Sequence, residues 1–328
     1  MTLRVAMIGY GFMGAAHSVG WRQAPRVFDL PEAVELAVIV GRNEEAVSRA
    51  AAKWGWAEHG VRAMVGFTYR RVPAVSLLQD LIARGTIGEV RQVRAAYRQD
   101  WLVDPSVPLG WRLQKEHAGS GALGDIGAHI VDMTQFVTGS LVTRVSGTVE
   151  TIVAQRPVLG VRSGFTGSAT GALGEATVDD VAIFTGRLDN GALVSFEATR
   201  FATGRKNALT IEVSGSEGAL AFDLERLNEL RHYDRNAPAE LQGFTTILVT
   251  EPEHPYVSAW WPPGHMLGYE HGFSHQVVDF VTAIAHGTAL DPTFAEGLAV
   301  QRVLAAVEES SAQDSAWVAV EAAAPARV

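Results

Sequence analysis

An aspartate and a histidine with the spacing for acid–base chemistry stand near the middle of the chain. Asp125 and His129 lie four residues apart in the segment Gly119–Asp132, so a helix would carry both on one face. A histidine beside a carboxylate can take a proton from a hydroxyl near neutral pH while a hydride leaves the same carbon. A pair of this kind is by itself more often structural than catalytic. The assignment of Asp125 and His129 as catalytic residues therefore depends on a second motif.

That second motif is a glycine-rich turn near the N-terminus. The segment Gly9–Gly14 has the spacing G-x-G-x-x-G, follows a predicted strand at residues 3–8 and opens a predicted helix at residues 14–23. Its glycines permit a tight turn and let backbone N–H groups approach a pyrophosphate at the helix N-terminus. This context favours dinucleotide binding over a chance turn between strand and helix. The residues predicted to contact the cofactor are Gly9, Gly11, Phe12, Met13 and Gly14.

The end of the second predicted strand, residues 35–40, bears on the choice of cofactor. An acidic residue is expected there to bind the adenosine ribose, but the chain has Gly41-Arg42-Asn43. An arginine at this place favours a ribose 2′-phosphate, which makes NADP at least as plausible as NAD. A solvated Arg42, or one stacked on the adenine, is the alternative. The predicted cofactor is therefore NAD or NADP, with Arg42 as a candidate contact.

Composition narrows the class of protein. The chain has 328 residues, of which 47% are hydrophobic and 19% charged, enough for two ordinary cores. Its net charge of -9 and the absence of a lysine- or arginine-rich block argue against nucleic acid as a partner. Zero cysteines exclude disulfides and thiolate chemistry. With no export signal and no apolar run of roughly 20 residues, the sequence predicts no membrane partner and a cytoplasmic location.

The elements around the glycine turn follow a β-α-β-α-β order. After the strand at residues 35–40 comes a Glu/Ala-rich helix that ends near Trp54, and Val61–Phe67 is predicted as a third strand. This order makes one mononucleotide-binding half, whereas a complete doubly wound domain has two. We therefore predict a shortened α/β Rossmann-type nucleotide-binding domain over residues 1–70.

Residues 71–328 are predicted to form an α+β domain for substrate binding and oligomerisation, with a large, mostly antiparallel open sheet. A helix at residues 73–83 precedes a change of pattern, after which strands dominate to about residue 249. Hairpin turns are predicted at Asp189–Gly191 and Gly215–Gly218. The Gly/Ser/Thr-rich segment Gln155–Thr177 is predicted as a long loop. The other predicted elements are a strand at 90–101 and helices at 120–137, 273–285 and 294–310.

These motifs together resemble the Gfo/Idh/MocA family of NAD(P)-dependent sugar and polyol dehydrogenases, over nearly the whole chain. The resemblance implies that His129 accepts the proton, or assists in accepting it, and that Asp125 orients the reacting hydroxyl. The segment Trp260–His275 is similar to members that act on anhydrosugars and inositol-like polyols, so the implied partner is a small sugar or polyol. The most specific shared parts are the Gly9–Gly14 turn with His17, Gly66–Arg71, Trp111–Glu116, Gly124–Asp132 and the C-terminal helices.

One departure from the family pattern concerns a lysine. The family's Glu-Lys-Pro motif places a lysine against the substrate hydroxyl and the nicotinamide, and no such motif occurs here. The three lysines, Lys53, Lys115 and Lys206, stand in other contexts. By resemblance, a segment with two strands and their helices is missing between about Trp56 and Val61. Two explanations stay open. Either the segment has been lost from the gene or its recorded sequence, or a dimer partner covers the strand edge that the gap exposes.

The sequence therefore leaves two alternative functions. The first is hydride transfer between NAD(P) and a secondary hydroxyl of a cyclic sugar, anhydrosugar or inositol-like polyol. The second is that of a catalytically inactive family member, a sugar-binding or oligomer-forming subunit. The open sheet predicts a homo-oligomer, a dimer or tetramer. His265, His271 and His275 cluster loosely, but no metal site is predicted because a clear acidic partner is absent.

Three further residues are weaker candidates for contacts with substrate: Arg70, Trp111 and Lys115. An arginine after a strand, such as Arg70, is often a solvated or ion-paired surface group. Trp111 is as readily a core or interface residue as a platform for a sugar face. Lys115 replaces the absent lysine only if its loop bends over the site.

Overall fold

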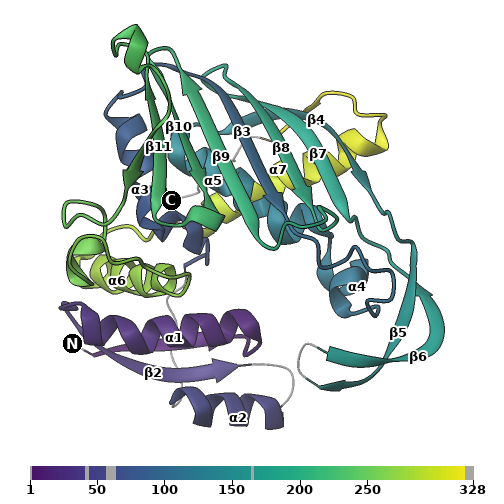
Figure 1. Cartoon of the computed structure of the whole chain (residues 1–328). Helices are drawn as coiled ribbons and strands as arrows, with labels where there is room; N and C mark the ends of the chain where they lie inside the picture. Colours follow the sequence, from purple (N-terminus) through teal and green to yellow (C-terminus); the bar gives the residue numbers. More distant parts are fainter. Residues whose placement is uncertain (1, 41–43, 57–63, 164–165, 322–328) are drawn as a thin grey trace. The chain divides into compact units, whose positions relative to one another are not determined.

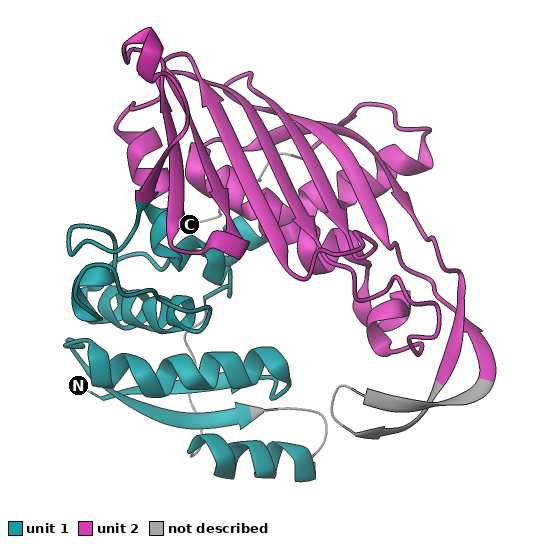
Figure 2. Cartoon of the chain, viewed as in Figure 1, with its two compact units in different colours: residues 1–77, 248–297 teal, residues 78–247, 298–328 magenta. Residues whose placement is uncertain are grey.

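The chain folds into two compact units, each built from two separate stretches (Figure 2). Unit 1 comprises residues 1–77 and 248–297, and unit 2 comprises residues 78–247 and 298–328. Unit 1 thus includes residues 248–297, which the sequence analysis assigned to the second domain. The division into functional domains 1–70 and 71–328 stays a prediction. The computed structural model describes residues 2–40, 44–56, 64–163 and 166–321.

Unit 1 begins with two β-α pairs in the predicted order. β1 (Thr2–Ile8) leads through the glycine turn into α1 (Phe12–Val27), and β2 (Ala33–Val40) precedes α2 (Glu44–Trp54). β1 and β2 pair in parallel along their whole lengths, and α1 supplies the crossover that two parallel strands require (Figure 1). The Rossmann-type start of the predicted fold is confirmed.

The predicted third strand is not part of this sheet. Residues 61–63 lie outside the described part of the chain, and residues 64–67 form no strand. The side chain of Gln276 donates to the Val65 carbonyl at 3.1 Å, and the Val65 N–H donates to the Pro292 carbonyl at 3.1 Å. The prediction is wrong for residues 64–67, because the C-terminal stretch of unit 1 makes the hydrogen bonds that a neighbouring strand would make.

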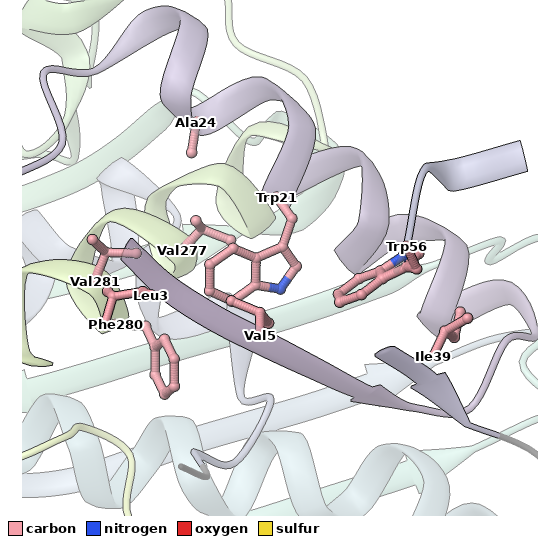
Figure 3. Close-up of a cluster of buried hydrophobic side chains, with 9 residues drawn as sticks. All are labelled: Leu3, Val5, Trp21, Ala24, Ile39, Trp56, Val277, Phe280 and Val281. Carbon is pink, nitrogen blue, oxygen red and sulfur yellow. The ribbon is translucent and has the colours of Figure 1, made fainter. Parts of the chain in front are cut away.

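The core of unit 1 joins its two stretches of chain. α6 (His271–His286), from the C-terminal stretch, packs along α1. Gly20 on α1 permits the close approach, because a Cβ there would lie 2.8 Å from the backbone of Phe273. Figure 3 shows the apolar side chains that fill the space between these elements. The buried members are Leu3, Val5, Trp21, Ala24, Ile39, Trp56, Val277, Phe280 and Val281.

Phe280 is expected to be a major contributor to this core. Its ring meets Trp21 edge-on, with 5.7 Å between centroids, and it is 8% exposed. We expect Phe280→Ala to lower the free energy of unfolding by about 3–5 kcal/mol, the cost of deleting a large buried side chain. Phe294, which is 65% exposed, provides the control, and Phe294→Ala should change that free energy by less than about 0.5 kcal/mol. Urea unfolding measures both, and equal losses would contradict the assignment of the core.

Unit 2 is built on a nine-stranded sheet with the order β12-β11-β10-β9-β3-β8-β7-β4-β13 (Figure 1). β3 and β8 run parallel, and the other neighbours with a defined register run antiparallel. The predicted large, mostly antiparallel sheet is confirmed. Its strands are β3 (Val90–Arg98), β4 (Val142–Glu150), β7 (Val181–Leu188), β8 (Leu193–Thr199), β9 (Ala208–Gly215), β10 (Gly218–Asp223), β11 (Glu229–Asp234), β12 (Thr245–Leu248) and β13 (Val318–Ala319).

Helices cover one face of this sheet. Figure 1 shows α5 (Ala128–Thr138) and α7 (Phe294–Ala312) on the same side of the strands. α5 packs against β3 and β9, and the hydroxyls of Ser310 and Ser311 on α7 accept hydrogen bonds from β4 at 3.0 Å. In the described part of the chain, no helix is long and apolar enough to cross a membrane. The shorter elements are η1 (Thr68–Arg71), α3 (Pro73–Ala83), η2 (Trp111–Leu113), α4 (Lys115–Ala118), η3 (Leu123–Gly127), η4 (Leu224–Arg226), η5 (Ala239–Leu241) and η6 (Val257–Ala259).

The Gly/Ser/Thr-rich segment predicted as a loop is a hairpin. β5 (Gln155–Ser163) and β6 (Thr166–Glu175) form a separate two-stranded antiparallel sheet. The Leu109 N–H donates to the Pro157 carbonyl at 2.7 Å, and a Cβ on Gly174 would lie 2.8 Å from the Leu109 side chain. Glycine is thus needed for close packing at the base of the hairpin. The loop prediction is wrong because it considered only the low strand propensity of glycine and not this packing requirement.

Candidate functional site

The glycine turn at the start of α1 has the geometry of an anion-binding turn. Gly9 has a φ of +105°, in the region that favours glycine. A Cβ on Gly14 would meet the Gly9 carbonyl oxygen at 2.2 Å, so the turn closes only with glycine there. A Cβ on Gly11 would meet nothing within 4 Å, and no side chain caps α1 at Gly11. The open space at Gly11 and the uncapped first turn fit a pyrophosphate bound by backbone N–H groups.

Four other candidate residues lie in or near this turn in the sequence or follow the next strand. Phe12 and Met13, which begin α1, are 51% and 41% exposed. Arg42, the predicted ribose contact, lies outside the described residues. Further along α1, burial lowers the pKa of His17 to about 4, and its ring meets Phe273 edge-on at 4.9 Å. His17 is therefore neutral at pH 7.

Asp125 and His129 lie on a helix whose first turn is widened. The helix predicted for residues 120–137 forms, but its first turn, Leu123–Gly127, is π-helical and continues into α5. Such turns occur frequently at functional sites. The Asp125 side chain is 40% exposed, whereas His129 is half-buried. Burial lowers the pKa of His129 to about 4, and the Asp125 carboxylate opposes this shift. At pH 7 His129 is neutral and able to accept a proton.

Asp179 fixes the start of this helix. Its Oδ1 accepts from the Gly121 N–H at 2.6 Å, and its Oδ2 accepts from the Leu123 N–H at 2.7 Å. A Cβ on Gly121 would lie 1.7 Å from the Asp179 carbonyl oxygen, which requires glycine at this contact. The sequence analysis missed Asp179, because the residues that it caps lie more than 50 positions earlier in the chain.

A buried arginine that the sequence analysis also missed pairs with Asp125. Arg200 directly follows β8, is 1% exposed, and donates from Nη2 to Asp125 Oδ2 at 2.8 Å. The sequence signal was weak, because an arginine after a strand has many possible partners. Only the order of strands in the sheet brings this one to Asp125.

A chain of hydrogen-bonded polar side chains begins at Tyr97, the residue whose ring lies near His129. The ring of Tyr97 on β3 is 6.2 Å from the His129 ring. The Tyr97 hydroxyl donates to Asn207 Oδ1 at 2.7 Å, and Gln99 Nε2 donates to the same oxygen at 2.8 Å. Trp101 Nε1 in turn donates to Gln99 Oε1 at 2.9 Å. This part of unit 2 therefore presents hydrogen-bonding groups of fixed orientation near the candidate base.

Arg70 is buried among carboxylates of its own unit. It is 4% exposed, and its Nη1 donates to Asp291 Oδ1 at 2.6 Å and to Glu296 Oε1 at 2.7 Å. The neighbouring Arg71 pairs with Asp279 and Asp291. The Arg70 guanidinium thus takes part in ion pairs within unit 1. This geometry gives no support to the predicted contact of Arg70 with substrate.

Trp111 and Lys115 lie near each other in sequence on two short helices of unit 2. Trp111 on η2 is 39% exposed, and the guanidinium of Arg112 lies 4.4 Å from the centre of its ring. Lys115 begins α4, and its Nζ is 3.7 Å from Glu308 Oε1. The Lys115 side chain is 62% exposed, so this ion pair is weak. The substrate roles of Trp111 and Lys115 stay predictions.

The histidines of the C-terminal stretch have structural surroundings. In the described part of the chain, no group of three or more His, Cys, Asp or Glu side chains is placed to hold a metal ion. His275 is fully buried, and Trp260 Nε1 donates to its Nε2 at 2.7 Å. Its Nδ1 therefore carries the proton and donates to the Arg71 carbonyl at 2.8 Å. His275 joins α6 to the segment after residue 67.

Acid is expected to destabilise unit 1 through His275. Burial lowers the pKa of His275 from 6.5 to about 4, so the unfolded chain binds a proton that the folded unit does not. The resulting stabilisation is complete above pH 6.5 and is lost as the pH falls toward 4, by up to about 3 kcal/mol. His275→Gln keeps a donor and an acceptor but binds no proton, so its free energy of unfolding should fall less steeply. Urea unfolding at pH 7 and pH 5 compares the two proteins, and equal slopes would refute this role.

Comparison with known proteins identifies the class of protein. The model of the GFO/IDH/MocA C-terminal domain matches residues 75–221. Levoglucosan dehydrogenase of Pseudarthrobacter phenanthrenivorans is 34% identical over 385 positions, which cover 97% of this chain and 98% of the relative. The crystal structure of an oxidoreductase domain protein from Kribbella flavida is 49% identical, with a TM-score of 0.91, and the match covers 98% of this chain and 100% of that one. A levoglucosan dehydrogenase structure with NADH and L-sorbose is 32% identical, with a TM-score of 0.89, and covers 98% and 99% of the two chains.

With a Rossmann-type start, a glycine turn and a large, mostly antiparallel sheet, the chain has the fold of these oxidoreductases. The chain belongs to the GFO/IDH/MocA family. The alignment with levoglucosan dehydrogenase has 385 positions, whereas this chain has 328 residues. Several tens of positions of the relative therefore have no counterpart here, which agrees with the missing internal segment inferred from the sequence.

Proposed function

We propose that this protein is an NAD(P)-dependent dehydrogenase that reversibly oxidises a secondary hydroxyl of a cyclic sugar, anhydrosugar or inositol-like polyol. The observation that carries the proposal is the helix that bears both Asp125 and His129, with the Asp125 carboxylate held by Arg200 at 2.8 Å. The similarity to levoglucosan dehydrogenase supports the substrate class, because levoglucosan is an anhydrosugar. A structure of a levoglucosan dehydrogenase contains NADH and L-sorbose, which supports a nicotinamide cofactor and a sugar ligand.

In this reaction His129 takes the hydroxyl proton. The hydroxyl O–H bond breaks, a C=O bond forms, and the C–H electron pair departs as hydride. The bound nicotinamide supplies the acceptor for that hydride. Burial keeps His129 neutral at pH 7, and the Asp125 carboxylate partly offsets the loss of basicity that burial causes. Asp125 fixes the hydroxyl and stabilises the imidazolium that results.

The glycine turn holds the cofactor in this proposal. Backbone N–H groups at the start of α1 bind the pyrophosphate, and Gly11 leaves the space for it. Phe12 and Met13, which are exposed in the first turn of α1, are proposed as further cofactor contacts. Arg42 is proposed to decide between NADP and NAD by binding the 2′-phosphate.

The chain lacks the lysine that the family places against the substrate hydroxyl, so the main question is how fast it turns over. A neutral His129 can accept the proton without that lysine, so we expect the chemistry to survive at a reduced rate. The alternative is a catalytically inactive subunit that binds sugar or forms an oligomer. It depends on the missing Glu-Lys-Pro motif and on the shortened nucleotide-binding domain, and the relatives named above do not support it.

We also propose that the protein is a cytoplasmic homo-oligomer, a dimer or tetramer. The observation in favour is that α5 leaves one face of the unit 2 sheet uncovered. It contains a hollow of about 720 Å³ with charges of both signs. Arg94 pairs there with Glu212 at 2.9 Å, and Arg98 pairs with Glu197 at 2.6 Å. Light scattering of the purified chain measures the oligomeric state.

A turnover assay tests the proposed reaction. The purified chain is incubated with NAD⁺ or NADP⁺ and, separately, levoglucosan, L-sorbose, glucose and myo-inositol, and nicotinamide absorbance is followed. The proposal predicts reduction of the nucleotide that depends on one of these polyols. Nucleotide binding without any turnover across a broad polyol panel would favour the inactive subunit instead.

A further inference from the structure

We propose that Arg200 is a positioning residue that holds Asp125 for the reaction, an inference that rests on the proposed function. Arg200 is 1% exposed, and its Nη2 donates both to Asp125 Oδ2 at 2.8 Å and to the Gly121 carbonyl at 3.0 Å. One nitrogen therefore connects the carboxylate to the first residues of the helix that carries it. Hydrogen bonds between charged groups are about twice as strong as neutral ones, so this contact restricts the Asp125 side chain.

The sheet fixes the place from which Arg200 acts. β7 and β8 are antiparallel, with Val181 opposite Thr199, so Asp180 and Arg200 are the next pair beyond the strands. The Arg200 N–H donates to the Asp180 carbonyl at 3.0 Å, and the Leu102 N–H donates to the Arg200 carbonyl at 3.3 Å. The backbone of Arg200 is thus held from both sides, and its side chain starts from a rigid position.

The surroundings of the guanidinium restrict it further. The ring of Trp101 lies 5.4 Å from it, and the fully buried Asp180 attracts it electrostatically. Its Nε and Nη1 are buried without a hydrogen-bond partner among the described residues. The hydrogen bonds to Asp125 and Gly121 therefore determine which way the guanidinium faces.

Asp125 needs such a partner because its own surroundings do not fix it. Its side chain is 40% exposed and belongs to a π-helical turn, so water competes for the carboxylate. Without Arg200 the carboxylate would rotate toward solvent and lose its orientation toward the hydroxyl that it fixes. A shift of about 1 Å in a reacting group can lower a rate by about 10²-fold. Arg200 contributes to catalysis through Asp125, without contacting the substrate.

A double-mutant cycle on turnover tests this dependence. The proteins are the wild type, Arg200→Met, Asp125→Asn and the double variant. We expect Arg200→Met to lower kcat by about 10- to 100-fold, with a smaller change in KM. In the Asp125→Asn background the same replacement should cost little more, because the carboxylate that Arg200 holds is already gone. Arg200→Lys keeps the charge and should restore part of the lost kcat.

The controls separate positioning from folding and from the proposed function. Arg205 pairs with Glu225 at 2.7 Å on the surface of the same unit, and Arg205→Met should leave kcat unchanged. Thermal unfolding identifies any variant that does not fold, in which case Arg200→Lys in the two Asp125 backgrounds completes the cycle. Equal factors for the Arg200 replacement in both backgrounds would overturn this inference alone. A wild type without turnover, or an Asp125→Asn variant as active as the wild type, would overturn the proposed function and this inference with it.

Discussion

Replacing His129 with asparagine is expected to lower kcat by about 10²- to 10⁴-fold, the usual contribution of a positioned base. Asparagine keeps a polar group of similar size but does not accept a proton at pH 7. KM for the polyol should change by only a few fold, because the proton moves in the transition state and not on binding. Steady-state turnover with a saturating nicotinamide cofactor measures both constants.

His117 provides the matched control for this replacement. It is exposed on α4 of the same unit, so His117→Asn removes a histidine without touching the pair around Asp125. We expect unchanged kcat for this variant. If His129→Asn turned over as fast as His117→Asn, His129 would not be the base, and the proposed mechanism would be wrong.

Replacing Gly11 with valine is expected to raise the dissociation constant of the nicotinamide cofactor by about 10- to 100-fold, or about 1.4 to 3 kcal/mol. A Cβ on Gly11 meets no protein atom within 4 Å, and its φ of -68° suits any residue. The valine side chain would therefore leave the fold intact and occupy the space through which the pyrophosphate reaches the backbone. Quenching or enhancement of nicotinamide fluorescence on titration measures the constant.

The control for this variant lies at the other end of the same turn. Gly14→Ala places a methyl group 2.2 Å from the Gly9 carbonyl oxygen, so it should distort the turn and lower the melting temperature. Gly11→Val should melt within a few degrees of the wild type. Unchanged nucleotide affinity in a folded Gly11→Val protein would show that the cofactor does not approach this turn.

Local patterns in the sequence were sufficient where a short segment decides its own structure. The glycine turn forms where its spacing predicts it, because Gly9 needs a positive φ and Gly14 needs close contact. The helix predicted at about residues 73–83 forms as Pro73–Ala83, and the turns between strands near residues 190 and 216 also form as predicted. Each of these features depends on residues within a few positions of one another.

Long-range contacts could not be predicted in the same way. The segment 64–67 makes hydrogen bonds to residues 276 and 292, more than 200 positions away. Arg200 meets Asp125 only because β7 begins and β8 ends beside the start of the helix, and no spacing in the sequence expresses that arrangement. A long-range ion pair of this kind can be predicted from a sequence only when the order of the strands is already known.

A single titration tests most directly whether the shortened nucleotide-binding region still works. The purified chain, with its mass checked against the 328-residue sequence, is titrated with NADH and with NADPH while nicotinamide fluorescence is followed. We predict saturable binding of at least one nucleotide, and a preference for NADPH would support the proposed contact of Arg42 with the 2′-phosphate. Absence of binding by a folded protein would contradict the account and leave the chain without dehydrogenase function.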